Sequence, residues 1–134
     1  MLIGVWVTAW ARKNLLENVL KLDSHVVYCD TDSIKLLEGY DKKVIEDYNN
    51  SVIEKLKTVS EKTEVDFERF QPKDVKGIKH LLGIFEHETT SKENQEFTYK
   101  EFITQGAKKY AYKTMDDKIK ITVSGVPKKR SSCS

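Results

Sequence analysis

The stretch that decides the fold is VVYCDTDSIK, from Val26 to Lys35. Apolar, β-branched and aromatic residues flank a short polar centre, which is typical of two strands joined by a tight turn. We expect strands over 25–29 and 33–37, with residues 30–32 between them. Asp30 and Asp32 stand one residue apart, and on an extended segment such residues share a face. Two carboxylates this close repel each other unless a cation, a proton or solvent intervenes.

The acidic pair has two interpretations on its residues alone. Hard oxygen ligands at a hairpin tip suit Mg²⁺, which takes one or two carboxylates and leaves its other positions to water and phosphates. The alternative is a polar turn whose acids simply face water, because two aspartates in this spacing are common in loops. Spacing does not choose between them.

Composition limits the class of protein. A chain of 134 residues is long enough for one domain with a core, and 39% hydrophobic with 33% charged residues is typical of a soluble globular protein. The net charge of +2 permits nucleic-acid binding without arguing for it. Cys29 and Cys133 predict no disulfide framework. The first apolar run is too short to span a bilayer and lacks the basic start of a signal peptide, so we expect a cytoplasmic protein without membrane contacts.

The remaining pattern predicts helices and further strands. Helical spacing covers 2–22, and a second helix begins after an N-cap at Asp41 and reaches about residue 60. A short strand is expected within 65–70, and longer strand-like runs are 81–88, 96–104, 109–114 and 118–123, the last two joined by a turn at 115–117. The basic and polar end, 127–134, is expected to be disordered. The sum is an α+β domain: a mostly antiparallel sheet with two main helices packed on one face.

Four short blocks resemble one family. YCDTDS (28–33) resembles the Y-x-D-T-D-S motif of family B DNA polymerases, in which a palm hairpin presents metal-binding aspartates. Upstream, GVWVTAWAR (4–12) resembles the G-V-x-x-T-A-x-A-R helix of the protein-primed branch, found in certain bacteriophages and plasmids. Downstream, LGIFEHE (82–88) resembles the L-G-x-[FWY]-x-x-E strand, and KKY (108–110) resembles the K-x-Y motif. The blocks occur in the family's order, whereas 38–79 aligns with none of them.

The resemblance implies catalytic and metal-binding roles for three acidic residues. Asp32 would be the main ligand of both catalytic ions, Asp30 would assist it, and Glu88 matches a carboxylate near the metal site. The implied cofactor is Mg²⁺, with Mn²⁺ as the other candidate. Two such ions activate the primer 3′-hydroxyl and stabilise the leaving pyrophosphate in nucleotidyl transfer.

The resemblance also implies DNA contacts. Tyr28 would pack under the primer terminus, although it fits an ordinary core aromatic equally well. Thr31 would shape the turn through its hydroxyl. Lys108 and Tyr110, expected two apart on one strand and pointing the same way, would contact the primer near its end, the lysine without sequence preference. The alternative for Lys108-Lys109 is a solvated charge pair on an edge strand.

Departures from the family limit what the chain is expected to do. An earlier D-x-x-S-L-Y-P block, a K-x-x-x-N-S-x-Y-G finger helix and 3′–5′ exonuclease motifs do not occur in it. The resemblance therefore implies the C-terminal portion of a palm, residues 1–126, inactive alone. Its partners would be primer–template DNA and dNTPs in the full-length enzyme, the rest of the polymerase and a terminal protein. The alternative is a non-catalytic nucleic-acid-binding α+β module that uses its sheet and lysines.

Overall fold

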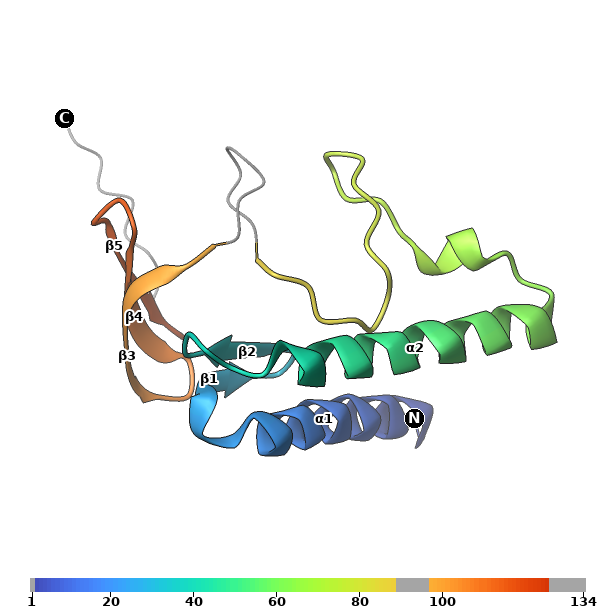
Figure 1. Cartoon of the computed structure of the whole chain (residues 1–134), viewed down its shortest axis with the longest axis horizontal. Helices are drawn as coiled ribbons and strands as arrows, with labels where there is room; N and C mark the ends of the chain where they lie inside the picture. Colours follow the sequence, from blue (N-terminus) through green and yellow to red (C-terminus); the bar gives the residue numbers. More distant parts are fainter. Residues whose placement is uncertain (1, 89–96, 126–134) are drawn as a thin grey trace. The chain divides into compact units, whose positions relative to one another are not determined.

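The chain forms two compact units, Met1–Glu86 and His87–Ser134 (Figure 1). A computed structural model describes residues 2–88 and 97–125. The first unit holds both long helices and a two-stranded sheet, and the second holds a three-stranded sheet. The predicted α+β class is confirmed, with all strand pairs antiparallel. The expected tail, 127–134, lies outside the described residues.

Helix α1 spans Leu2–Leu22, as predicted, and is followed by a short 3₁₀ turn, η1 (Asp23–His25). Its buried stripe consists of Leu15, Asn18 and Leu22, which are 7%, 1% and 3% exposed. Leu16 and Leu20 of the same helix are exposed. Apolar residues surround the first half of this helix on every side, so periodicity alone could not choose a face. The helix contacts α2 and β1.

A polar side chain lies inside this small core. The Nδ2 of Asn18 donates a hydrogen bond to the carbonyl of Asn14 at 2.8 Å. Its Oδ1 is buried and has no hydrogen-bond partner within the described parts of the chain. Burying an unpaired amide oxygen costs free energy, so Asn18 weakens the contact that it fills.

The predicted hairpin is present. Strand β1 (Val26–Asp30) pairs with β2 (Ser33–Leu36), and each strand begins and ends within one residue of its predicted bounds. Asp30 is the partner of Ser33, which leaves only two residues in the connection. At the open end, the N–H of Leu37 donates to the carbonyl of His25 at 2.8 Å.

Helix α2 spans Lys42–Thr63 and begins as predicted. The Asp41 carboxylate caps it by accepting the Lys43 N–H at 3.0 Å. Its apolar positions are half-buried, apart from Val59, which is 44% exposed. The strand expected within 65–70 is wrong: Phe67–Phe70 form a 3₁₀ helix, η2, because Asp66 accepts the Glu68 N–H at 3.1 Å and acts as an N-cap.

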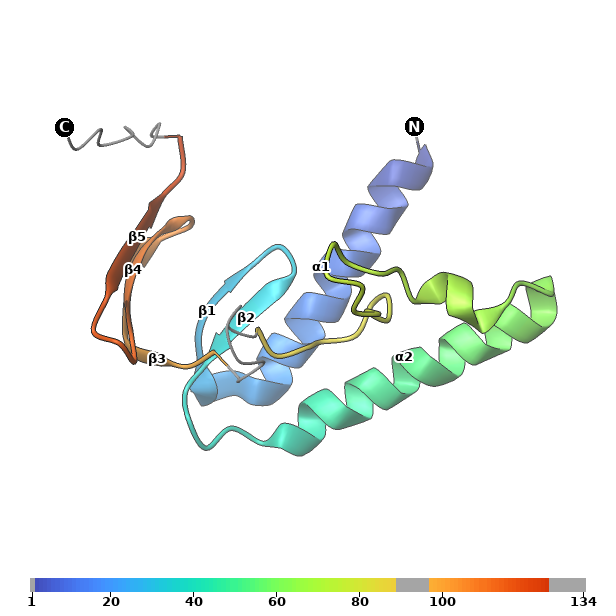
Figure 2. The same ribbon diagram turned by 90° about the horizontal axis from the view of Figure 1, so that it is seen from above.

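The strand expected over 81–88 is also wrong. After η2 the chain doubles back along α2, as Figures 1 and 2 both show. Asn49 of α2 donates to the Phe85 carbonyl at 2.9 Å and accepts the Phe85 N–H at 2.8 Å. Tyr48 donates its hydroxyl to the Gly83 carbonyl at 3.2 Å. Side chains of a helix thus take the backbone groups that a neighbouring strand would have paired.

The second unit is a sheet in the order β3-β4-β5. The strands are β3 (Tyr99–Gly106), β4 (Lys109–Thr114) and β5 (Ile119–Val123), close to their predicted ranges. The start predicted at residue 96 lies outside the described residues. The expected turn at 115–117 joins β4 to β5, where Thr114 accepts the Lys118 N–H. The strands therefore belong to two sheets rather than one. No helix in residues 2–88 and 97–125 combines the length and apolar character needed to cross a membrane.

Candidate metal and nucleic-acid site

A tight turn forms the apex of the β1–β2 hairpin, with Thr31 and Asp32 between the two strands. The N–H of Asp32 donates to the carbonyl of Asp30 at 2.5 Å, and Thr31 lies at the centre with φ 49°. A positive φ is unusual for a β-branched residue and stores of the order of 1–3 kcal/mol of strain. Strain of this kind is typical of positions where the local geometry serves a ligand.

The side chains of the turn hold each other only in part. Thr31 Oγ1 donates to Asp30 Oδ1 at 3.0 Å, and Ser33 Oγ donates to the Asp30 carbonyl at 3.3 Å. Thr31 thus shapes the turn through its hydroxyl. The Asp32 carboxylate is exposed, and within the described residues it takes part in no hydrogen bond or ion pair.

The sequence argument that Asp30 and Asp32 share a face assumed an extended path through Thr31. The backbone turns at Thr31 instead, so strand alternation does not relate the two carboxylates. What brings the two residues together is the backbone turn, in which the Asp32 N–H donates to the Asp30 carbonyl. Tyr28 lies in β1 opposite Lys35 and is half-buried. Half-burial fits a core aromatic and also a ring with one edge open to a ligand.

The donors at this apex fit a hard cation. Carboxylate oxygens are the ligands that Mg²⁺ prefers, and one or two are sufficient where water and phosphate complete the coordination. No three His, Cys, Asp or Glu side chains gather as a metal-binding group in residues 2–88 and 97–125. Asp30 and Asp32 would therefore hold Mg²⁺ together with other ligands, such as water and phosphate oxygens.

Lys108 lies in the β3–β4 connection and Tyr110 lies in β4, both in the second unit. Lys108 is in the turn, with φ 59°, and β4 begins only at Lys109. The expectation that Lys108 and Tyr110 share one strand is wrong for this reason, and strand alternation does not relate their side chains. The Lys108 carbonyl accepts the Ser124 N–H at 3.0 Å.

Tyr110 belongs to a row of aromatic rings on the sheet. Its ring stacks with Phe102 at a centroid distance of 5.3 Å and with Tyr112 at 6.3 Å. Tyr99 packs edge-to-face on Tyr112 at 4.7 Å. The row makes one side of this sheet aromatic, whereas Ile103 on the strand next to Tyr110 is 66% exposed.

Glu88 also lies in the second unit. Its Oε2 accepts the Tyr99 hydroxyl at 3.1 Å, and its carbonyl accepts the Phe97 N–H at 2.7 Å. That Glu88, Lys108 and Tyr110 face the same DNA end as Asp30 and Asp32 stays a prediction, because the two groups belong to different units.

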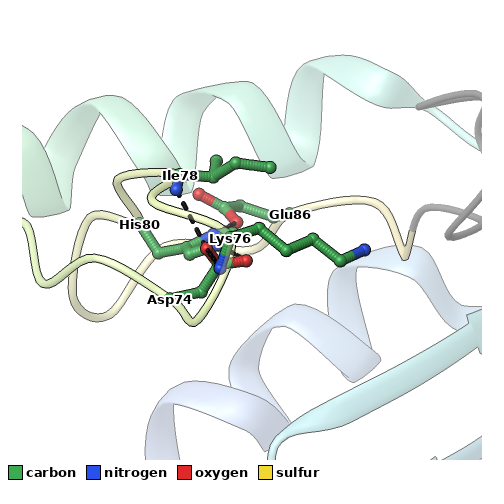
Figure 3. A network of polar contacts seen from close by, with 5 residues as sticks. All are labelled: Asp74, Lys76, Ile78, His80 and Glu86. Atoms are coloured by element: carbon green, nitrogen blue, oxygen red, sulfur yellow. Dashed lines mark hydrogen bonds and ion pairs between the residues drawn. The ribbon is translucent and has the colours of Figure 1, made fainter.

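Sequence reasoning missed a polar network in the first unit (Figure 3). His80 Nδ1 lies 2.7 Å from Glu86 Oε2, and its Nε2 lies 3.5 Å from Asp74 Oδ2. The hydrogen bond to Glu86, and then the one to Asp74, raise the pKa of His80 above its usual value. The bonds that Asp74 accepts, first from the Ile78 N–H, lower the pKa of Asp74. The sequence signal was Asp74 followed by Gly77, a common pairing for the ends of a turn.

Comparison with models of protein families, with curated proteins and with solved structures finds no match for this chain. The resemblance to family B polymerases rests on its motifs alone.

Proposed function

We propose that this chain is part of the palm of a family B DNA-directed DNA polymerase of the protein-primed, phage or plasmid type. The observation that carries the proposal is the hairpin apex. Asp30 and Asp32 flank Thr31, which has a strained backbone, at the turn between paired strands, and the Asp32 carboxylate engages no other described residue. An ordinary solvated turn has no need of a β-branched residue at positive φ, whereas a site that presents two acids to a ligand tolerates that strain.

The apex residues would act by binding and orienting. Asp32 would be the principal metal ligand and Asp30 its helper, and the resemblance assigns Glu88 to the same metal site. A pair of Mg²⁺ ions supplies activation of the primer hydroxyl and neutralises charge on the transferring phosphoryl group. Lys108 and Tyr110 would hold the primer strand, and Tyr28 would support its terminus. Because the motif that carries the other metal aspartate in this family is not in the sequence, the chain supplies part of the site and does not polymerise alone.

The setting follows from the family. The partners are primer–template DNA, dNTPs, the rest of the polymerase and, with protein priming, a terminal protein. Such an enzyme works in the cytoplasm of a bacterial or phage-infected cell.

Manganese binding tests the metal site. Paramagnetic Mn²⁺, added below stoichiometry to the isotope-labelled chain, should broaden the amide NMR signals of 29–34 first, and Mg²⁺ in excess should reverse the effect. Asp32→Asn should abolish the localised broadening and Asp30→Asn should weaken it. The matched control is Asp47→Asn on the exposed side of α2, which should change nothing. Broadening that is absent, or that survives Asp32→Asn, overturns the proposal.

A primer-extension assay tests the second part. The chain alone, with Mg²⁺ and dNTPs, is expected not to extend a primer. Clear extension would contradict the assignment as an incomplete palm.

The aromatic row on the second sheet favours one alternative. Stacked rings of Phe102, Tyr110 and Tyr112 beside a lysine-rich turn resemble the surfaces on which unpaired bases stack. A non-catalytic nucleic-acid-binding module would use this surface and leave the aspartates as a turn. It predicts DNA binding that Tyr110→Ala weakens, together with no localised Mn²⁺ effect at 29–34.

A further inference from the structure

The segment from η2 to Leu82 forms a small closed loop. The N–H of Leu82 donates to the Phe70 carbonyl at 3.0 Å, and the N–H of His80 donates to the Pro72 carbonyl at 2.9 Å. Lys73 and Lys79 form the next antiparallel bridge. These bonds make a short ladder whose tip is the turn 74–78. This segment belongs to none of the four motif blocks.

Asp74 closes the tip. Its Oδ1 accepts the Lys76 N–H at 2.8 Å and the Ile78 N–H at 2.9 Å, and its own N–H donates to the Ile78 carbonyl at 2.9 Å. Gly77 takes φ 81°, which glycine adopts without strain. The tip therefore has one defined backbone conformation.

His80 ties this loop to the rest of the first unit. It lies between Asp74 of the tip and Glu86, as Figure 3 shows. Glu86 follows Phe85, whose backbone is held on both sides by Asn49 of α2. Through these contacts the loop is linked to helix α2.

This loop concentrates positive charge. Between 69 and 80 the cations are Arg69, Lys73, Lys76 and Lys79, and the only carboxylate is that of Asp74, which is already engaged by the backbone and His80. Lys73 lies directly opposite Lys79, an arrangement that destabilises an antiparallel pair. Lys79 pairs with Glu68 at 2.9 Å, whereas the ammonium groups of Lys73 and Lys76 form no ion pair with any described residue.

Two features decide what this surface fits. Lys76 extends away from the polar network in Figure 3, and Val75 at the tip is fully exposed. Lys73 and Lys79 lie opposite each other and Lys76 lies between them in the turn, so the three lysines gather around one tip, and such a cluster of cations complements closely spaced single negative charges. The phosphates of a DNA backbone are such charges.

We propose that the 73–79 turn is a binding site for the sugar–phosphate backbone of duplex DNA, with Lys73, Lys76 and Lys79 as its phosphate contacts. The site is separate from the hairpin apex and needs no metal there. It adds affinity without reading sequence, because phosphate contacts carry no base information.

Salt dependence of DNA binding tests this site. A fluorescently labelled short duplex is titrated with the full chain at several salt concentrations, and anisotropy gives the binding constant. The test variant carries Lys73→Gln, Lys76→Gln and Lys79→Gln. The matched control carries Lys55→Gln, Lys57→Gln and Lys62→Gln, which remove the same charge from exposed positions of α2. Each lost phosphate contact should reduce the slope of log K against log salt by about 0.9, so the test variant should lose roughly 2–3 units of slope and the control almost none.

Single and auxiliary measurements guard against misfolding. Lys76→Gln alone, whose side chain forms no ion pair with the described residues, should reduce the slope by about 0.9. Protection of the Ile78 amide against hydrogen exchange shows whether the turn is intact in every variant. The Mn²⁺ experiment, run on the triple variant, should still show broadening at 29–34. Loss of DNA binding with Mn²⁺ binding retained supports this site independently of the polymerase proposal. If the triple variant keeps its DNA binding while Mn²⁺ broadens the signals of 29–34, only the DNA site fails. If DNA binding depends on the lysines while Mn²⁺ does not broaden 29–34 in the unchanged chain, only the metal site fails.

Two outcomes would overturn the proposal. One is a test variant that binds DNA with the same slope as the control. The other is a test variant that still binds DNA, while poly-glutamate displaces DNA from the unchanged chain but not from this variant. That result would assign the turn to an acidic protein partner.

Discussion

Two turns of the first unit, 30–32 and 74–78, use their aspartates in opposite ways. In the basic turn, Asp74 accepts two backbone N–H groups and pairs with His80. In the acidic turn, the hydrogen bond from the Asp32 N–H to the Asp30 carbonyl closes the turn, and the Asp32 carboxylate is exposed. A carboxylate engaged by the backbone holds a turn, whereas one left exposed at an apex is available to a ligand.

The same contrast applies to the backbone. Where the basic turn requires a positive φ, the chain has Gly77. Where the acidic turn requires one, the chain has Thr31, which is costly there. The basic turn is therefore relaxed and internally held, and the acidic turn is strained and open. Four measurements test this difference.

The largest expected difference is between alanine substitutions at the two turns. Asp74→Ala removes the acceptor of two N–H groups, so hydrogen-exchange protection at Lys76 and Ile78 should fall by about an order of magnitude. Asp32→Ala should change the free energy of unfolding by no more than about 0.5 kcal/mol, since it removes an exposed side chain without described partners. Amide exchange by NMR and urea unfolding followed by circular dichroism measure the two effects. Equal losses would show that both aspartates are structural.

Gly77→Ala should destabilise the basic turn by about 1–2 kcal/mol, because an L-residue at φ 81° is strained. A Cβ at this position would meet no atom within 4 Å, so the cost is conformational rather than steric with neighbours. Urea unfolding measures it. The control, Gly4→Ala in exposed helix α1, should instead stabilise by about 0.5–1 kcal/mol. A neutral Gly77→Ala would contradict the conformation of this turn.

Thr31→Gly should change the free energy of unfolding in the opposite direction to Gly77→Ala and by a smaller amount. It relieves the positive φ but loses the hydrogen bond to Asp30 and raises the entropy of the unfolded chain, so we expect a gain of about 0.5 kcal/mol. Thr31→Ser keeps the hydroxyl and serves as the control for that hydrogen bond. Thermal unfolding of the three proteins gives the order, and a destabilised Thr31→Gly would show that the apex is not strained.

The smallest effect is the pH dependence of the basic turn. The pKa of His80 is raised in the folded chain, so its contribution is complete below the unfolded value of 6.5 and is lost as pH rises through the folded pKa. The pKa of Asp74 is lowered, so its contribution is present above 3.8 and is lost as pH falls through its folded pKa. NMR titration of His80 and exchange at Ile78 follow both limits. His80→Gln should remove the upper limit only, and an unchanged upper limit would refute the role of His80.

Local sequence determined much of the fold. Helix α1, the β1–β2 hairpin, the start of α2 at its Asp41 cap and strand β4 lie where side-chain pattern and capping placed them. These elements are set by neighbours a few residues away, through helical or alternating spacing and a nearby cap. The YCDTDS motif also identified the apex that became the candidate site, although a turn at Thr31, and not strand alternation, relates its two aspartates.

Tertiary structure decided the remainder. Residues 81–88 carry a strand pattern, yet Asn49 and Tyr48 of α2 take their backbone groups, and no rule based on neighbouring residues indicates that pairing. Helix α1 is apolar on several sides, so its sequence does not say which side is buried. Its contacts with α2 and β1 decide that side, and Asn18 lies on it. The network of Asp74, His80 and Glu86 depends on how the chain folds back on itself. Spacing records which side chains share a face, whereas the partner of a backbone or charged group is whichever group the fold brings within hydrogen-bonding distance.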